Sequence, residues 1–119
     1  MNPDELKSRT KKLSLEIIHI VETLPITRSA NAIVNQLLRS GTSVGANYRA
    51  AYRARSRADF ASKAGIAIEE ADETMYWMEL LCESGLVPKE RLSVLIEEAN
   101  ELISILTASV ITARANLKK

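Results

Sequence analysis

The chain has 119 residues, of which 46% are hydrophobic and 26% are charged, and its formal net charge is only +1. This length suffices for one hydrophobic core and is too short for two, so we expect a single domain over residues 1–119. Four glycines, three prolines and few aromatic residues, in a chain dominated by alanine, leucine, isoleucine, glutamate and arginine, predict an all-α protein without strands.

Cys82 is the only cysteine, which excludes an internal disulfide and is typical of a reducing compartment. The amino terminus lacks a basic start followed by an apolar stretch, and no apolar run approaches the ~20 residues needed to cross a bilayer. We therefore expect a cytoplasmic protein with no membrane partner.

Apolar residues at helical spacing predict a first helix over residues 3–24, which ends before Pro25. A second apolar series predicts a helix over residues 28–53 that contains Gly41 and Gly45. A glycine inside a helix costs about 0.5–1 kcal/mol relative to alanine. We therefore expect both glycines to allow a close backbone approach or a local bend.

The third helix is expected to start after Ser56, an N-cap residue, with the carboxylate of Asp59 in its first turn. Gly85 is placed to end it as a left-handed cap. Pro88 suits the first turn of a fourth helix that continues almost to the end of the chain. Four long amphipathic helices joined by short connections predict an antiparallel up-and-down four-helix bundle.

Several apolar residues fall outside the predicted core stripes and recur at helical spacing on three of the helices. They are Leu15, Ile18, Ile66, Trp77, Leu80, Val94 and Ile105. A wide core would absorb them, but aligned exposed apolar stripes usually mark interfaces. We therefore predict self-association through these residues, with Trp77 as an anchor.

The residues able to perform chemistry do not assemble into a reaction centre. His19 is the only histidine, so the chain cannot supply the two Glu-x-x-His pairs that a di-metal bundle motif requires. The acidic run over residues 69–73 points around its helix and is interpreted as a solvated face. Cys82 lacks an activating base and is interpreted as a buried structural thiol. We therefore predict a non-enzymatic protein with no catalytic residues, no metal site and no cofactor.

Positive charge is concentrated over residues 39–63, whereas residues 69–101 are strongly acidic. The basic residues are Arg39, Arg49, Arg53, Arg55, Arg57 and Lys63. Helical geometry places Arg39, Arg49 and Arg53 in one outward sector opposite the core. Arg55 and Arg57 fall in the following turn and extend this surface.

Arginine rather than lysine at most of these positions favours paired hydrogen bonds to phosphate or carboxylate. One partner is a nucleic-acid backbone, with Tyr48 or Tyr52 available for stacking, although Tyr48 has the spacing of a core residue. The other is the acidic third or fourth helix of the protein itself or of a second copy. The pI of 7.9 is below that of a dedicated nucleic-acid binder, and both alternatives stay open.

Three runs, over residues 36–51, 56–60 and 73–81, resemble the bacterial four-helix-bundle proteins first noticed in intervening sequences of large-subunit ribosomal RNA genes. The most specific parts are the run from Ser43 to Asn47 and the pair Tyr76-Trp77. The resemblance covers nearly the whole chain. It implies an up-and-down bundle that assembles into a ring, commonly a homopentamer, without established enzymatic activity.

The accessory protein of diversity-generating retroelements looks like a relative, and it binds nucleic acid and a reverse transcriptase through a basic ring surface. The resemblance therefore implies RNA, DNA or a protein such as a reverse transcriptase as partners, with the six basic residues of the 39–63 segment as counterparts. The acidic third helix departs from a strongly basic ring. The alternative function is that of a structural or protein-interaction subunit that binds no nucleic acid.

Overall fold

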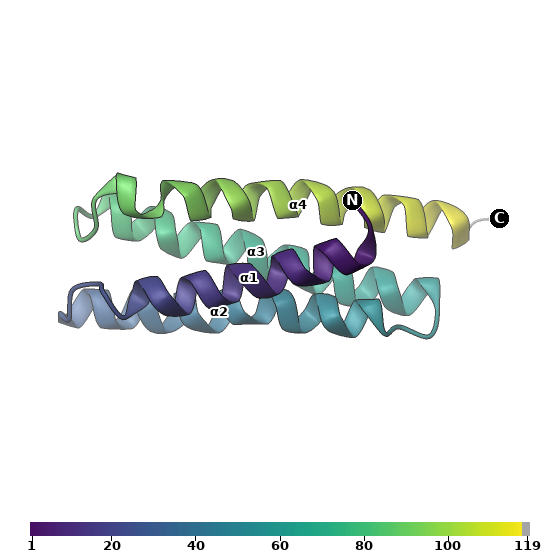
Figure 1. Cartoon of the computed structure of the whole chain (residues 1–119), viewed down its shortest axis with the longest axis horizontal. Helices are drawn as coiled ribbons and strands as arrows, with labels where there is room; N and C mark the ends of the chain where they lie inside the picture. Colours follow the sequence, from purple (N-terminus) through teal and green to yellow (C-terminus); the bar gives the residue numbers. More distant parts are fainter. Residues whose placement is uncertain (118–119) are drawn as a thin grey trace.

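The computed structural model describes residues 1–117, which form four antiparallel α-helices packed side by side (Figure 1). The helices are α1 (Pro3–Val21), α2 (Arg28–Tyr52), α3 (Arg57–Glu83) and α4 (Lys89–Leu117). They form a rod of 52 × 21 × 20 Å, with no strand within the described residues. This confirms the predicted all-α four-helix bundle.

Around the rod the helices follow the order α1, α2, α3, α4, because each packs mainly on its neighbours in the sequence. The contact that closes the circle, between α4 and α1, is the sparsest of the four. Within residues 1–117 no helix combines the length and the apolar character needed to span a membrane.

Helix ends are set by local hydrogen bonds, as the sequence predicts for α3. The Ser56 side chain accepts a hydrogen bond from the backbone N–H of Asp59 at 3.0 Å, which confirms Ser56 as the N-cap. Gly85 has a φ of 80°, and the N–H of Val87 bonds back to the carbonyl of Leu81 at 3.0 Å. This is the left-handed C-cap expected of glycine.

The first helix is shorter than predicted, because α1 ends at Val21 and residues 22–24 form a turn. Leu24 is nevertheless buried, so its side chain continues the apolar stripe after the helix itself has ended. Pro25 disfavours helical backbone at the residue before it, which explains why the turn closes here.

The core combines small residues on α3 with leucines on α4. Ala64, Ala67 and Ala71 are fully buried. The Thr74 hydroxyl donates a hydrogen bond to the backbone carbonyl of Glu70 and lies 3.0 Å from the hydroxyl of Ser40. Small side chains let the neighbouring helices approach α3 closely, while the larger leucines of α4 fill the interior. The last residue of the predicted α4 stripe, Leu117, is 51% exposed because it lies beyond the packed core.

Gly41 and Gly45 lie where α2 crosses α1. A Cβ on Gly41 would stand 2.6 Å from the Cδ1 of Ile17. A Cβ on Gly45 would stand 3.2 Å from the carbonyl oxygen of Thr10, which is α1 backbone. The predicted close backbone approach is confirmed, and it brings the polar flanks of α1 and α2 together.

Candidate functional site

Arg39 is paired with acidic residues of α3. Its Nη1 lies 3.1 Å from the Oε2 of Glu70, its Nη2 contacts the carboxylate of Glu73, and its Nε donates to Gln36 at 3.1 Å. Glu73 also accepts a hydrogen bond from the Nε1 of Trp77 at 3.0 Å. Arg39 therefore braces α2 against α3, as the second sequence-based alternative expects of an arginine.

The other arginines of the segment lack such partners. Arg49, Arg53, Arg55 and Arg57 are exposed, and none forms an ion pair within the described residues. Lys63 is half-buried and has no acidic partner in that part of the chain either. The predicted stripe thus divides into one paired arginine and a set of free cations around the α2–α3 turn.

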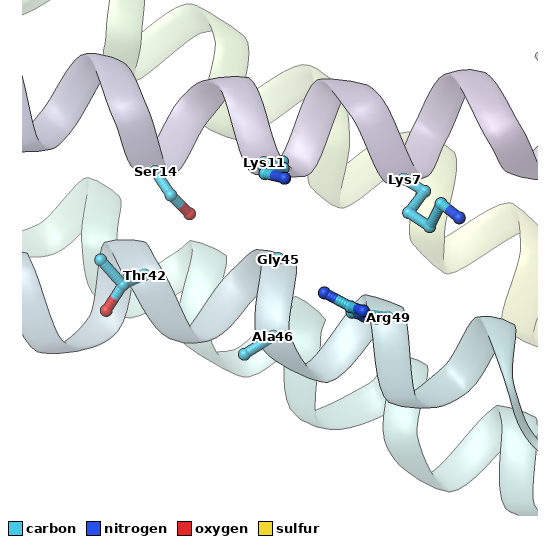
Figure 2. A pocket seen from close by; sticks show the side chains of 7 residues that line it. All are labelled: Lys7, Lys11, Ser14, Thr42, Gly45, Ala46 and Arg49. Atoms are coloured by element: carbon cyan, nitrogen blue, oxygen red, sulfur yellow. The ribbon is translucent and has the colours of Figure 1, made fainter.

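A hollow of about 380 Å³ lies between α1 and α2 and contains part of this free positive charge (Figure 2). It is lined by Lys7, Lys11 and Ser14 from α1 and by Thr42, Gly45, Ala46 and Arg49 from α2. Three of these seven residues are cationic and none is acidic. We call this hollow the α1/α2 groove.

Lys7 and Lys11 were not among the basic residues singled out from the sequence. They stand four positions apart on one helix, so they share a face, and Ser14 continues that face one turn later. This spacing was the available signal, but it does not show which helix the face meets. Only the packing of α1 on α2 brings both lysines beside Arg49.

Tyr52 lies at the end of α2, beside the start of α1. The Nζ of Lys7 lies 4.2 Å from the centre of the Tyr52 ring, and the Tyr52 hydroxyl donates to the Oδ1 of Asp4 at 2.6 Å. That hydrogen bond to a carboxylate raises the pKa of Tyr52 above its ordinary value. Tyr52 is 40% exposed, whereas Tyr48 is only 2% exposed and belongs to the core, as its spacing predicts.

The predicted interface residues do not share one face. Leu15, Ile18, Ile66 and Val94 are exposed, whereas Trp77, Leu80 and Ile105 are half-buried. Ile66 and Trp77 are eleven positions apart and lie on the side where α2 and α3 meet, since Trp77 donates to Glu73 and Glu73 pairs with Arg39 of α2. Val94, 70% exposed, lies on the side where α1 and α4 meet.

A second hollow, of about 510 Å³, follows the sparse α1–α4 contact. Its lining includes Val94 and four glutamates, Glu16, Glu97, Glu98 and Glu101. Arg9 crosses it to reach Glu98, and this hydrogen bond raises the pKa of Arg9. The α1–α4 side is therefore mainly acidic, whereas the α1/α2 groove is basic.

The remaining reactive side chains stand apart from one another. His19 is exposed on α1, and burial raises the pKa of the half-buried Cys82, which keeps its thiol protonated near neutral pH. Across residues 1–117, no three side chains of histidine, cysteine, aspartate or glutamate are grouped to hold a metal ion. The absence of enzymatic activity stays a prediction.

Comparison with known proteins places the chain in a family. Residues 5–108 match the model of the 23S rRNA-intervening sequence protein. The fold is similar to a crystal structure of a protein of unknown function from the S23 ribosomal protein family of Bacteroides thetaiotaomicron VPI-5482. The two share 32% sequence identity and a TM-score of 0.83 over 92% of this chain and 98% of that one. The comparison with curated proteins finds no match. These findings confirm the resemblance seen in three runs of the sequence, and the chain belongs to the 23S rRNA-intervening sequence protein family.

Proposed function

We propose that this protein is a non-enzymatic, self-assembling subunit that binds the phosphate backbone of RNA or DNA. The observation that carries the proposal is the cluster of cations without acidic partners where the start of α1, the end of α2 and the start of α3 meet. We call this cluster the basic end, and its members are Lys7, Lys11, Arg49, Arg53, Arg55 and Arg57.

Stabilisation of the helix ends explains only some of the positive charges at the basic end. Arg49 lies in the last turn of α2, where a cation also stabilises the helix dipole. Arg57 is the first residue of α3, where a positive charge faces the positive end of the dipole and gains nothing for the helix. Free cations held close together are the feature that phosphate backbones bind, since each neutralised phosphate releases counterions.

Self-assembly is supported by the two separate sides that carry unburied apolar residues. Trp77 lies on the α2–α3 side and Val94 on the α1–α4 side, and these sides are opposite because of the helix order around the rod. A contact that joins one side of a copy to the opposite side of the next is heterologous, and it closes into a ring when the rotation fits. We therefore propose that the protein assembles into a ring, and we expect this ring to be a homopentamer.

The second candidate is a purely structural or protein-interaction subunit without nucleic-acid binding. The bracing of α2 against α3 by Arg39, Glu70 and Glu73 favours it, because there an arginine neutralises the protein's own carboxylates. In that case the basic end faces an acidic protein surface, either of another copy or of a partner such as a reverse transcriptase.

Salt-dependent binding of mixed-sequence RNA and DNA oligonucleotides separates the two candidates. If the proposal is correct, affinity falls steeply with salt, with a logarithmic slope of about −0.7 per phosphate contacted on a single strand. Absence of binding to either nucleic acid at ~50 mM salt, with the assembly intact, contradicts the proposal and leaves the structural subunit. Affinity that does not change with salt contradicts it as well.

A further inference from the structure

We infer that the α1/α2 groove, together with Tyr52, is a subsite for single-stranded nucleic acid. Backbone phosphates lie along Lys7, Lys11 and Arg49, and an unpaired base stacks on the exposed part of the Tyr52 ring. This inference rests on the proposed function, and it assigns a location and a strand type to the binding.

The three cations are the only groups lining the groove that are free to donate hydrogen bonds to phosphate. The hydroxyl of Ser14 already donates to the carbonyl oxygens of Thr10 and Gly41, and that of Thr42 donates to the carbonyl of Leu38 at 2.7 Å. Backbone N–H groups in the groove are used within the helices. Binding through the groove is therefore electrostatic, and it is expected to depend on each of the three cations.

The positions of these cations suit an extended polyanion. Lys7 and Lys11 stand one helical turn apart, about 6 Å along the axis of α1, and Arg49 faces them from α2 (Figure 2). A strand that runs along the groove meets one cation after another. No carboxylate lines the groove itself, and that of Asp4, beside its end, accepts a hydrogen bond from the Tyr52 hydroxyl.

The groove exists because its floor lacks side chains. The close contact with the backbone of Thr10 explains Gly45, whereas no packing contact requires a small residue at the exposed Ala46. The Ala46 side chain lies at the outer edge of the hollow and points away from α1 (Figure 2), so a longer side chain there would not displace the core. Position 46 is therefore where the charge at the edge of the groove can be changed while the bundle stays intact.

Tyr52 favours a single strand over a duplex and over an acidic protein segment. Exposed aromatic rings beside a cationic groove are typical of single-strand binding, because bases stack on them whatever the sequence. In a duplex, the faces of the bases are stacked on each other and are not available to the ring. An acidic segment of a second copy would form ion pairs with the cations and would have no base to stack on the Tyr52 ring.

The test compares two substitutions of equal size in the groove. Ala46→Glu adds a carboxylate among the cations, whereas Ala46→Gln adds a neutral side chain of the same shape. We expect fluorescence anisotropy with labelled oligo-dT and oligo-U of about ten nucleotides to show affinity at least tenfold lower for Ala46→Glu than for Ala46→Gln. Ala108→Glu, an exposed change on α4, controls for added charge alone and is expected to match the wild type.

Three further variants address the cations and the ring. Lys11→Gln is expected to reduce the magnitude of the salt slope by about 0.7, the value for one phosphate contact on a single strand. Tyr52→Leu is expected to lower affinity about 5- to 100-fold through lost stacking. Tyr52→Phe, which keeps the ring and loses the hydrogen bond to Asp4, is expected to retain most of the affinity. Circular dichroism and thermal midpoints verify that each variant is folded.

Failure of this inference is distinguishable from failure of the proposed function. If Arg53→Gln weakens binding while Ala46→Glu and Tyr52→Leu do not, the protein binds nucleic acid elsewhere and the groove assignment is overturned. If the wild type binds no oligonucleotide, both are overturned. Equal affinity for duplex DNA, or for uridine monophosphate alone, overturns the single-strand assignment. Loss of self-association in Ala46→Glu, without loss of binding, assigns the groove to a second copy.

Discussion

Arg9 on α1 holds Glu98 on α4 through two parallel hydrogen bonds, from Nε to Oε2 at 3.0 Å and from Nη2 to Oε1 at 2.5 Å. Both side chains are about three-quarters buried, and the pair crosses the sparsest helix contact of the bundle. Planar, two-point pairing of this kind is the strongest form of ion pair in proteins. The pair therefore holds α1 against α4 where apolar packing is thin.

Removing this pair is predicted to loosen α1 first. Arg9→Met is expected to lower the free energy of unfolding by about 1–2 kcal/mol, since it breaks hydrogen bonds to a charged group and leaves Glu98 partly buried. Hydrogen exchange of α1 amides should accelerate more than that of α3 amides. Glu101→Gln, at a more exposed carboxylate 3.2 Å from Arg9, is the control and should have a smaller effect. Equal effects of the two variants would contradict this role.

Two glycines with opposite surroundings test the close approach of α1 and α2. Gly45→Ala is expected to destabilise the fold, because the new Cβ meets the rigid backbone of Thr10, which cannot rotate away. Gly65→Ala is expected to stabilise it by about 0.5–1 kcal/mol, because open space surrounds that helical position. Urea denaturation of both variants measures the two signs. Stabilisation by Gly45→Ala would show that the helices can separate without cost.

The division between paired and free arginines predicts different effects on nucleic-acid affinity. Arg39→Gln should leave the affinity nearly unchanged, because Glu70 and Glu73 already neutralise Arg39, and should lower stability by about 0.2–1 kcal/mol. Arg53→Gln should weaken binding and reduce the magnitude of the salt slope by about 0.7. Filter binding over a range of salt concentrations measures both. The reverse ranking would place the nucleic-acid surface on the α2–α3 side.

Assembly is best tested at Val94, since the half-buried Trp77 packs against the core and its replacement would also disturb folding. Val94→Glu places a charge on an exposed apolar position of the α1–α4 side, so we expect a lower mass in solution with an unchanged helix content. Light scattering with circular dichroism measures both. Ile111→Glu, at a similarly exposed position that is absent from the predicted interface, should keep the wild-type mass. An unchanged mass for Val94→Glu removes this side from the interface.

Cys82 provides a prediction about pH. Burial raises the pKa of its thiol, so in the folded protein the thiolate fraction at pH 8 is lower than in the unfolded chain. Alkylation by iodoacetamide at pH 8 should therefore be slower in buffer than in urea. The rate for the folded protein should rise as the pH increases through the raised pKa. Faster alkylation of the folded protein would indicate an activated thiol and contradict the structural interpretation of Cys82.

The sequence alone determines the four helices and most of their ends, because these depend on residues within a few positions of one another. The cap at Ser56, the left-handed Gly85 and the burial of Tyr48 all follow from local spacing, and the structure confirms them. The end of α1 is the exception, since Leu24 keeps the apolar spacing of a helix while its backbone has already turned. Periodicity reports which side chains are buried and not which backbone conformation carries them.

The tertiary structure alone decides the partners of the charged residues. Arg39 and Arg49 occupy the same outward sector by periodicity. Arg39 nevertheless pairs with glutamates of α3, whereas Arg49 lines the groove beside α1. Lys7 and Lys11 join that groove only because Gly45 lets α1 and α2 approach closely. A sequence defines the face on which a side chain lies, but the neighbour that it meets depends on how all four helices pack around one core.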